Sequence, residues 1–517
     1  MLALIAAFFQ QHPVLLLCAF WVTWLHRYVR LLVNCVSHWC YKTVPIPANP
    51  SYSSKDVTVI IPTIHNNFEE LRESLQSILA CHPYELLLVT TSNKYQKLTR
   101  FAKTLEVSNI RIFQVPIANK RIQVCEAIPK AKTSIIIMAD DDVTWPGTIL
   151  PWLLAPFENK KIGGVGPCQR VKRLRTGTFG EFQYNWLGAA YIERRNFEIS
   201  ATHGIDGGTS CMSGRTCAFR SEILQDPLFL EGFKTERWGP YSLNADDDNF
   251  VTRWLVSNQW KTWIQYNRQC EIETTLENNY KFLYQCSRWA RSNWRSNWTS
   301  TVTERHVWTQ QPWSLYALHL ATFTSLSFVF DPWILTASYV IYGWSGLCLQ
   351  TIFMFALVKT VKLWGLWRRN PIDVIYYPTS VLFGWFHGTI KLWALATLRI
   401  TSWGSRADGD TNDAERMYPR ARRSESITLP PGNHPGLVRY KDEKDFPITS
   451  EKQRDSDSDD FSEKDFPTTS EKQRDSDSDD FSESDLGFYS SRSDDDNDSY
   501  DDRTSKPNSV STKSHGR

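Results

Sequence analysis

Between Val57 and Asp142 the sequence alternates short apolar runs with longer amphipathic ones, and this alternation constrains the fold more than any other feature. A short apolar run predicts a buried strand, and an amphipathic run with helical periodicity predicts a helix on a sheet surface. The predicted strands are Val57 to Pro62, Glu85 to Thr90, Asn109 to Val115 and Ser134 to Ala139, and the predicted helices are Glu69 to Ala80 and Lys94 to Leu105. Strands that alternate with helices pair in parallel, so we expect an α/β fold with a mainly parallel sheet.

Three consecutive aspartates, Asp140 to Asp142, follow the last of these predicted strands. Open parallel sheets bind ligands at the carboxyl ends of their strands, so these carboxylates lie where a ligand is expected. Alternation along an extended chain turns Asp140 and Asp142 to one side and Asp141 to the other. Such a pair can hold a divalent cation and address the phosphates of a nucleotide together. The alternative is an acidic helix cap before Pro146.

A second acidic cluster, Asp246 to Asp248, precedes a predicted helix over Asn249 to Val256. A carboxylate at such a position can accept the proton of a hydroxyl group during a displacement reaction. Asp247 is our candidate for this general base. Helix starts also favour aspartate because it complements the helix dipole, so an ordinary helix start is the alternative.

Gln285, Arg288 and Trp289 form the pattern Gln-x-x-Arg-Trp in a segment with helical periodicity. At helical spacing the three side chains share one face, which provides a hydrogen-bonding amide, a cation for a diphosphate and an indole platform for a sugar. An amphipathic helix that lies on anionic lipid headgroups is the alternative, and it is compatible with the first role.

The N-terminal segment from Val14 to Val33 is mostly apolar and has no signal-peptide cleavage site, so we expect a signal anchor. Arg27, Arg30 and Lys42 lie toward its C-terminal side, which places the N-terminus outside and the following domain in the cytosol. Eleven cysteines without a Cys-x-x-Cys pair fit reduced cytosolic thiols better than a disulfide framework.

Three further apolar stretches follow Pro312, each near the length that spans a membrane. They are Ser314 to Phe330, Trp333 to Val358 and Asp373 to Leu398. Three crossings would leave the tail outside, whereas the basic residues that follow the stretches favour the inside, which points to one interfacial or re-entrant stretch. The number of crossings therefore stays open.

The sequence from about Gly404 onward is rich in Ser, Asp, Glu, Arg and Pro, a composition that predicts a disordered tail. The tail contains a tandem duplication, Glu443 to Ser462 and Glu463 to Ser482, whose acidic serine runs suit phosphorylation or a solvated spacer. We divide the chain into an N-terminal anchor with its juxtamembrane segment (1–50), a cytosolic α/β domain (51–311), C-terminal membrane or interfacial helices (312–403) and the tail (404–517).

The chain carries three motifs in order: the two acidic clusters, Asp140 to Asp142 and Asp246 to Asp248, and then the Gln-x-x-Arg-Trp pattern. Apolar segments that end in Trp403, Gly404, Ser405 and Arg406 follow them. This layout resembles the processive family 2 glycosyltransferases, which include hyaluronan, chitin and cellulose synthases. The layout from Val57 to Arg406 is similar to the fungal type 2 glycosyltransferases related to hyaluronan synthase. The resemblance implies a GT-A fold, which is Rossmann-like, and a reaction with inversion at the anomeric carbon. It also implies magnesium or manganese as cofactor, and export of a polymer through the membrane helices of the same chain.

The resemblance assigns roles by motif match. Asp140 and Asp142 correspond to the nucleotide and metal aspartates of the family, Asp247 to its catalytic base, and Gln285, Arg288 and Trp289 to its residues at the acceptor and the diphosphate. Pro62 and Thr63 would border the nucleobase pocket, and Lys120 or Arg121 matches a basic segment near the donor.

Two segments depart from the family pattern. Ser213 and Gly214 belong to a Cys-x-Ser-Gly segment similar to the acceptor side of the family, but Arg215 stands where relatives usually carry proline. Many relatives have an acidic pair followed by arginine where this chain has three aspartates, so Asp246 is the alternative base if the register shifts by one residue. In the terminal motif Ser405 replaces threonine and keeps a hydroxyl group.

The resemblance predicts a membrane-bound hexosyltransferase that transfers sugar from a nucleotide sugar, expected to be a UDP-sugar, to a growing polysaccharide. The expected partners are this donor, the polysaccharide acceptor and membrane lipids, with no nucleic acid. We expect a multi-pass protein of the plasma membrane or secretory-pathway membranes that serves fungal cell wall or extracellular matrix assembly and hyphal growth. The alternatives are a non-processive glycosyltransferase for a lipid or short acceptor, and a catalytically silent membrane scaffold.

Overall fold

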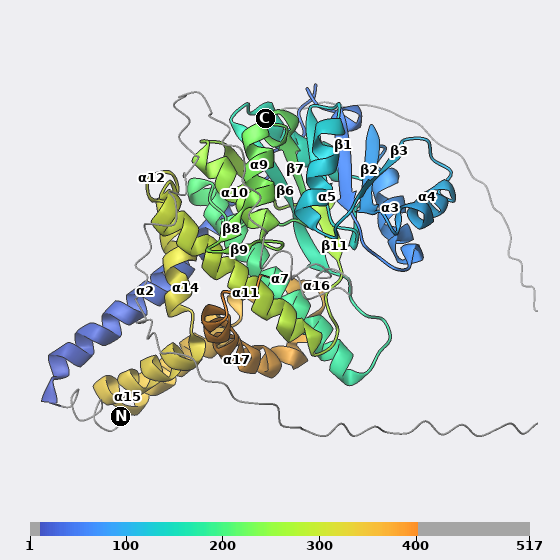
Figure 1. Ribbon diagram of the computed structural model, residues 1–517. Helices are drawn as coiled ribbons and strands as arrows, with labels where there is room; N and C mark the ends of the chain where they lie inside the picture. Colours follow the sequence, from blue (N-terminus) through green and yellow to red (C-terminus); the bar gives the residue numbers. More distant parts are fainter. Residues whose placement is uncertain (1–10, 402–517) are drawn as a thin grey trace, which may run out of the picture. The chain divides into compact units, whose positions relative to one another are not determined.

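The order of strands in one large sheet positions the predicted site. The computed structural model describes residues 11–401, which all belong to one unit, and the predicted tail with its duplication and the Trp403 to Arg406 motif lie outside them. The sheet has nine strands in the order β3-β2-β1-β4-β7-β6-β11-β5, with β10 beside β6 (Figure 1). The bounds are β1 Val57–Pro62, β2 Glu85–Thr91, β3 Ile110–Val115, β4 Ile135–Ala139, β5 Val143–Thr144, β6 Ile162–Val171, β7 Thr216–Arg220, β10 Lys261–Gln265 and β11 Glu271–Thr274.

The strand directions confirm the predicted mainly parallel sheet. Strands β3, β2, β1 and β4 are parallel neighbours, and β10 and β11 both run parallel to β6. Strand β7 is antiparallel to both β4 and β6, and the short strand β5 is antiparallel to β11. A separate hairpin consists of β8 (Arg237–Trp238) and β9 (Tyr241–Ser242).

Burial on both faces explains why the first strands are continuous apolar runs. Strands β1, β2 and β4 are buried at every position. Val59 and Ile61 pack with α3 and α4 on one face, whereas Ile60 packs with α5, α9 and α10 on the other. These helices and their short neighbours span α3 Arg72–Leu79, α4 Tyr95–Lys103, α5 Lys120–Ala127, α6 Ile149–Leu154, α8 Ser221–Leu224, α9 Pro227–Thr235 and α10 Asp247–Ser257. The two predicted helices of this region are confirmed as α3, with a preceding 3₁₀ turn, and α4.

Two long helices that the α/β pattern did not predict in full connect this sheet to the C-terminal helices. Helix α7 (Phe179–Asp206) begins with a capping box between Thr178 and Glu181 and ends at Gly207, whose positive φ of 75° suits glycine. Helix α11 (Lys281–Trp298) contains the Gln-x-x-Arg-Trp pattern and confirms its helical spacing.

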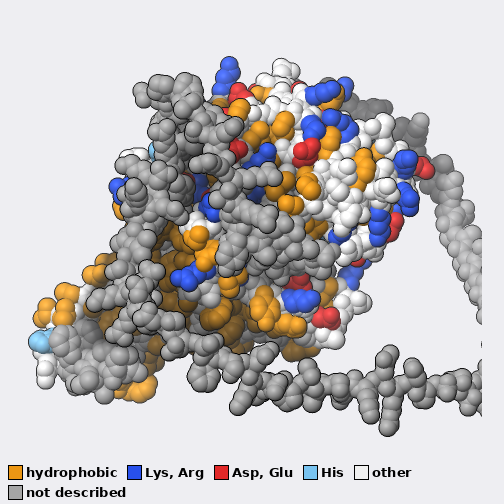
Figure 2. Space-filling view, in the orientation of Figure 1, with side chains coloured by type: hydrophobic (Ala, Val, Ile, Leu, Met, Phe, Trp, Pro, Cys, Tyr) orange, Lys and Arg blue, Asp and Glu red, His pale blue; other side chains and the backbone are white. Residues whose placement is uncertain are grey.

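Two segments among residues 11–401 are long and apolar enough to cross a membrane. The first is α2 (Pro13–Cys40), which extends the predicted anchor by several residues at its C-terminal end, and the second is Ser327–Arg369. The second segment comprises α15 Ser327–Ile352, the π-helical turn η8 Phe353–Val358, the 3₁₀ turn η9 Val361–Leu363 and α16 Trp364–Arg369. Hydrophobic side chains gather over the ends of α2 and α15 (Figure 2).

The structure corrects the expectation for the first C-terminal stretch, because Ser314 to Phe330 does not form one spanning helix. It divides into α13 (Pro312–Ser314, after α12, Val307–Gln310), the π-helical turn η7 (Leu315–Leu320), α14 (Ala321–Thr324) and the start of α15. The Ser325 hydroxyl donates to the Thr322 carbonyl at 2.7 Å, and Leu326 leaves the helical conformation with ψ 79°. Side chains that bond to the local backbone in this way compete with helix continuation. The third stretch forms the 3₁₀ turn η10 (Pro371–Tyr376) and α17 (Tyr377–Ala396), which packs against α11.

Trp186 on α7 packs where the sheet domain joins the C-terminal helices. Its side chain is fully buried in a cluster that includes Leu363, Leu366 and Phe383, and its ring lies 5.4 Å from that of Tyr376. Replacing such a side chain by alanine leaves a cavity and costs about 3–5 kcal/mol.

We expect Trp186→Ala to lower the apparent melting temperature of the purified protein in detergent. Phe179→Ala is the matched control, because Phe179 lies on the same helix but is 71% exposed. Equal melting temperatures for Trp186→Ala and the control would contradict the packing role.

Candidate active site

Nearly all the site residues predicted from the sequence line one cavity of about 1030 Å³, and its lining includes the ends of β1 and β4 and parts of α10 and α11. The predicted residues in its lining are Pro62, Thr63, Lys120, Asp140, Asp142, Ser213, Gly214, Asp246, Asp247, Gln285, Arg288 and Trp289. Arg121 is absent from this lining. Its guanidinium points into the protein, where it donates to the Phe233 and Ala245 carbonyls and to Glu236. Of the two basic candidates, Lys120 therefore faces the cavity.

Lys120 joins the two acidic clusters. It is the first residue of α5, and its Nζ lies 2.7 Å from Asp140 Oδ1 and 2.9 Å from Asp247 Oδ2. Burial lowers the pKa of Lys120, but the charges of Asp140 and Asp247 outweigh this effect and hold it above its ordinary value. The lysine therefore stays protonated and pairs with one carboxylate from each cluster.

Gly214 allows this arrangement to form. A Cβ atom at this position would lie 3.0 Å from Lys120 Nζ and 3.3 Å from Asp247 Oδ2, so any side chain would push against the ion pair. The preceding Ser213 hydroxyl accepts a hydrogen bond from the Arg215 backbone N–H at 3.4 Å. The Cys-x-Ser-Gly segment thus provides the close backbone wall beside the bridging lysine.

Asp141 is buried while Asp140 and Asp142 are partly exposed, but Asp141 and Asp142 lie in a turn rather than in an extended chain, and all three aspartates line the cavity, so the expected alternation is only partly present. Asp141 Oδ2 lies 3.6 Å from His65 Nε2. Within residues 11–401, no group of three or more His, Cys, Asp or Glu side chains is arranged to hold a metal ion. Mg²⁺ is often held by one or two carboxylates with substrate phosphates and water, so Asp140 and Asp142 fit a cation that binds together with a nucleotide.

Asp246 has a structural environment unlike that of its neighbours. It caps α10 with a positive φ of 68°, and its carboxylate accepts from Arg295 Nε at 2.7 Å and from Arg295 Nη2 at 3.1 Å, with a further bond from the Ser292 hydroxyl. Both side chains of the pair are 3% exposed. Arg295 also donates to the Leu398 and Ile400 carbonyls, so this pair fastens α10 and α11 to the end of the described chain.

Asp247 and Asp248 differ in the charges they meet. Burial raises the pKa of Asp247, but Lys120 outweighs burial, so its pKa lies below the ordinary value. Burial and the charge of Asp247 raise the pKa of Asp248, although Arg195 acts in the opposite direction. The carboxylate of Asp247 is therefore ionised at neutral pH and positioned beside the strand-end aspartates.

The Gln-x-x-Arg-Trp residues face the acidic clusters across the cavity. Burial lowers the pKa of Arg288, and the charges of Asp248, Asp246 and Asp247 oppose that effect. The Gln285 amide oxygen is buried without a hydrogen-bond partner among the described residues. Trp289 lies 5.1 Å from the Tyr191 ring, and the Arg215 guanidinium lies over its indole at 5.5 Å. The three side chains do share one face, as predicted, and that face borders the cavity.

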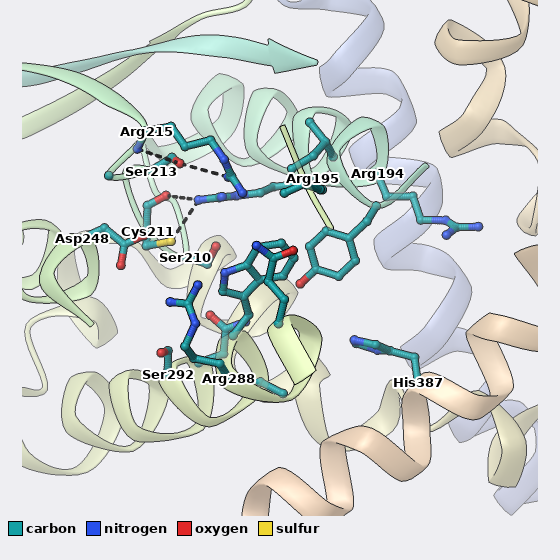
Figure 3. Close-up of a pocket in the computed structure, with 18 of the residues that line it drawn as sticks. Arg194, Arg195, Ser210, Cys211, Ser213, Arg215, Asp248, Arg288, Ser292 and His387 are labelled. Atoms are coloured by element: carbon teal, nitrogen blue, oxygen red, sulfur yellow. Dashed lines mark hydrogen bonds between the residues drawn. The ribbon is translucent and has the colours of Figure 1, made fainter. Parts of the chain in front are cut away.

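Several cavity residues were not identified from the sequence as site residues. Arg195 on α7 donates to the Cys211 carbonyl and sulfur at 3.1 and 3.0 Å, and Arg215 donates to Ser213 (Figure 3). A cation in the middle of a long helix has no sequence signal that separates it from a surface arginine. Arg215 was visible only as a departure from the family pattern, and its place over Trp289 depends on the fold.

Breaking the buried Asp246–Arg295 ion pair should lower the stability of the protein. Asp246→Asn keeps the shape but leaves the buried Arg295 charge without its carboxylate, which costs about 3–5 kcal/mol. We expect a clear fall in the apparent melting temperature. Glu69→Gln is the control, because Glu69 pairs with Arg72 on the exposed surface and its loss should change melting little. An unchanged melting temperature for Asp246→Asn would exclude the structural role.

Comparisons with known proteins agree with the family expected from the sequence. The family described as "Glycosyltransferase like family 2" matches residues 54–292. A type 2 glycosyltransferase of Gibberella zeae is 64% identical over 428 residues, which cover 81% of this chain and 80% of that protein. A hyaluronan synthase of Streptococcus pyogenes serotype M3 is 21% identical over 383 residues, which cover 70% and 85%.

Among solved structures, a mannosyltransferase from Pyrobaculum calidifontis, determined with GDP-Man and Mn²⁺, is similar with a TM-score of 0.46 and 16% identity over 76% of this chain and 98% of that one. The matched family segment contains the parallel sheet, both acidic clusters and most of α11. The match to the relative from Gibberella zeae covers most of both chains. This protein therefore belongs to the family 2 glycosyltransferases, among those described as type 2, and has their GT-A-like fold.

Proposed function

We propose that this protein is a membrane-bound, inverting glycosyltransferase that transfers a sugar from a UDP-sugar to a growing polysaccharide. The observation that carries the proposal is the Lys120 bridge between Asp140 and Asp247, which brings a strand-end aspartate and a candidate base to one point in the cavity. Trp289 on the opposite wall supplies an apolar platform for a sugar ring.

In this proposal the acceptor hydroxyl attacks the anomeric carbon while the bond from that carbon to the diphosphate breaks. Asp247 takes the hydroxyl proton, because it is ionised and lies next to the donor end of the cavity. Lys120 and Arg288 attract the charge that develops on the departing diphosphate. A single displacement of this kind inverts the configuration at the anomeric carbon.

Asp140 and Asp142 are the residues proposed to hold magnesium or manganese with the donor diphosphate. When bound there, the cation supplies charge neutralisation to the leaving group. Pro62 and Thr63, at the end of β1, are proposed to border the base, and the Thr63 backbone is held by Val89 and Gln123. Ser213 and Gly214 are proposed to lie on the acceptor side. Asp246 is the weaker candidate base, because Arg295 and Ser292 already occupy its oxygens.

The cellular part of the proposal rests on α2 and Ser327–Arg369, the candidate membrane helices among the described residues. We propose a multi-pass protein of the plasma membrane or of secretory membranes, with residues 51–311 as the cytosolic catalytic domain and fungal wall or matrix assembly and hyphal growth as its setting. A transferase for a lipid-borne acceptor is the second candidate, favoured by the cations of the two candidate membrane segments that line the cavity, Arg27, Arg30, Lys359 and Lys362. A catalytically silent scaffold is the third reading.

The first test measures nucleotide release by the purified protein with magnesium or manganese and each common UDP-sugar in turn. We expect Asp247→Asn to abolish release, because it keeps size and removes the proton acceptor. Glu231→Gln, an exposed acidic residue on α9, is the control. Polymer that glycosidases digest would support the polysaccharide acceptor. Normal turnover by Asp247→Asn would refute its assignment, and no release from any donor would favour the scaffold.

Lys120 predicts a change in pH dependence. The positive charge keeps the pKa of Asp247 low, so the base stays ionised as pH falls and activity is lost only at acidic pH. Lys120→Met removes that charge and raises the pKa of Asp247, which moves the acid limb of the kcat profile to higher pH by about one unit. Lys120→Arg should keep the limb near its original position. An acid limb that does not move in Lys120→Met would argue against Asp247 as the titrating base.

A further inference from the structure

The cavity continues past the Gln-x-x-Arg-Trp face to an end lined by basic side chains, which we call the basic chamber. Its six cations come from four parts of the chain that the sequence separates widely: Arg27 and Arg30 on α2, Arg194 on α7, Lys359 and Lys362 after α15, and Lys391 on α17. Each of the six acts electrostatically on at least one other, so they form one cluster. Arg27 and Arg30, which suggested a membrane boundary in the sequence, thus line the cavity.

Two carboxylates, Asp331 and Glu198, oppose these six cations among the described residues of the chamber. Asp331 is shared, because Arg27 lies 2.8 Å and Lys359 2.5 Å from its two oxygens. Glu198 pairs with Lys362, and burial, which raises its pKa, is outweighed by Lys362 and Arg30, so the pKa falls to about 2. The side chains of Arg27, Lys359 and Lys362 are only 12, 15 and 19% exposed.

The other three cations, Arg30, Arg194 and Lys391, donate hydrogen bonds to neutral acceptors. Arg30 donates to the Ala317 carbonyl at 2.9 Å, Lys391 to the Ser325 hydroxyl at 2.6 Å and Arg194 to the Ser380 hydroxyl. Burial lowers the pKa of Arg194 to about 10. Buried charges are normally paired because desolvation is costly. Four cations in excess of carboxylates within one cavity therefore call for a multivalent anion.

The surroundings of the chamber indicate what carries that anion. Candidate membrane helix α2 and the Ser327–Arg369 segment supply four of its cations, and both expose hydrophobic side chains, Val22 and Leu32 on α2 and Leu349 and Ile352 on α15 among them. At the other side, Tyr191 is in ring contact with both Trp289 and His387, so one residue separates the proposed sugar platform from the chamber wall. Figure 3 shows Arg194 and His387 on this side of the pocket, away from Asp248 and Cys211.

We propose that the basic chamber binds the phosphate group of a membrane lipid that bears, or is, the sugar acceptor. The hydrocarbon chain then lies along the apolar helices, and the phosphate occupies the chamber beside Tyr191. When the lipid phosphate is itself the acceptor, one of its oxygens bonds to the anomeric carbon as the bond from that carbon to the nucleoside diphosphate breaks, and the diphosphate leaves with the nucleotide. When the lipid bears a sugar, a hydroxyl of that sugar forms the new bond and Asp247 takes its proton. This inference rests on the proposed glycosyl transfer for its acceptor role, and a polysaccharide grown on such a lipid is consistent with that proposal. The phosphate site itself can be tested without any transfer reaction.

The binding test uses the full-length protein in uncharged detergent and a fluorescent polyisoprenyl monophosphate, with the corresponding polyisoprenol as the uncharged probe. We expect the phosphate to bind at least about tenfold more tightly than the alcohol, because charge-assisted hydrogen bonds contribute more than one kcal/mol each. Lys391→Gln and Arg194→Gln should each weaken the phosphate probe about tenfold and leave the alcohol unchanged. Equal affinities of the wild type for phosphate and alcohol would overturn the proposal.

Controls separate charge from folding. Lys161→Gln removes an exposed lysine outside the cavity lining and should bind as the wild type does, and Lys391→Arg should restore most of the affinity. Melting curves check that each variant is folded. Displacement of the probe by uronic-acid oligosaccharides or inorganic phosphate at lower concentrations than by unlabelled polyisoprenyl phosphate would overturn the lipid assignment.

The acceptor role is read from transfer of labelled sugar into organic-solvent-extractable product when polyisoprenyl phosphate is supplied. Labelled lipid supports the inference. Nucleotide release without labelled lipid overturns the acceptor role and leaves the glycosyltransferase proposal intact. Tight phosphate binding without nucleotide release from any donor would support the lipid-phosphate site and contradict the proposed glycosyl transfer.

Discussion

The position of the Lys120 ammonium group between Asp140 and Asp247 is the interaction on which the candidate site depends. Without a cation between them, the two carboxylates would repel each other, which would oppose the approach of the end of β4 to the start of α10. Three local features make room for the lysine. The Asn119 side chain caps α5, Gly214 presents no Cβ, and Arg295 holds Asp246 away on the other side.

The cavity changes electrostatic character along its length. At the sheet end, carboxylates from two clusters are opposed by Lys120, Arg195, Arg215 and Arg288, an arrangement suited to a cation and a diphosphate that arrive together. Beyond Trp289 and Tyr191 the balance reverses, and six cations are opposed by Asp331 and Glu198.

Much of the site was predictable because its residues follow strands or share a helix face. Asp140 and Asp142 come directly after an apolar run, which places them at a strand end, and Gln285, Arg288 and Trp289 have helical spacing, which places them on one helix face. The first C-terminal apolar stretch was harder, since Ser325 and Leu326 interrupt a segment whose composition is suited to a spanning helix. Hydropathy averages over a window and does not register a single change of backbone conformation.

The sequence by itself determined the parallel sheet, the strand-end carboxylates, the helical Gln-x-x-Arg-Trp face and the family, because these follow from periodicity and motif order along the chain. Only the tertiary structure decided that Lys120 rather than Arg121 faces the cavity, that Asp246 is engaged by Arg295, and that cations of α2, α7 and α17 meet in one chamber. Adjacent residues on a helix differ in direction by about 100°, and partners distant in sequence are chosen by packing. The direction of a helix residue and its distant partners therefore both depend on contacts between elements, which a linear pattern does not contain.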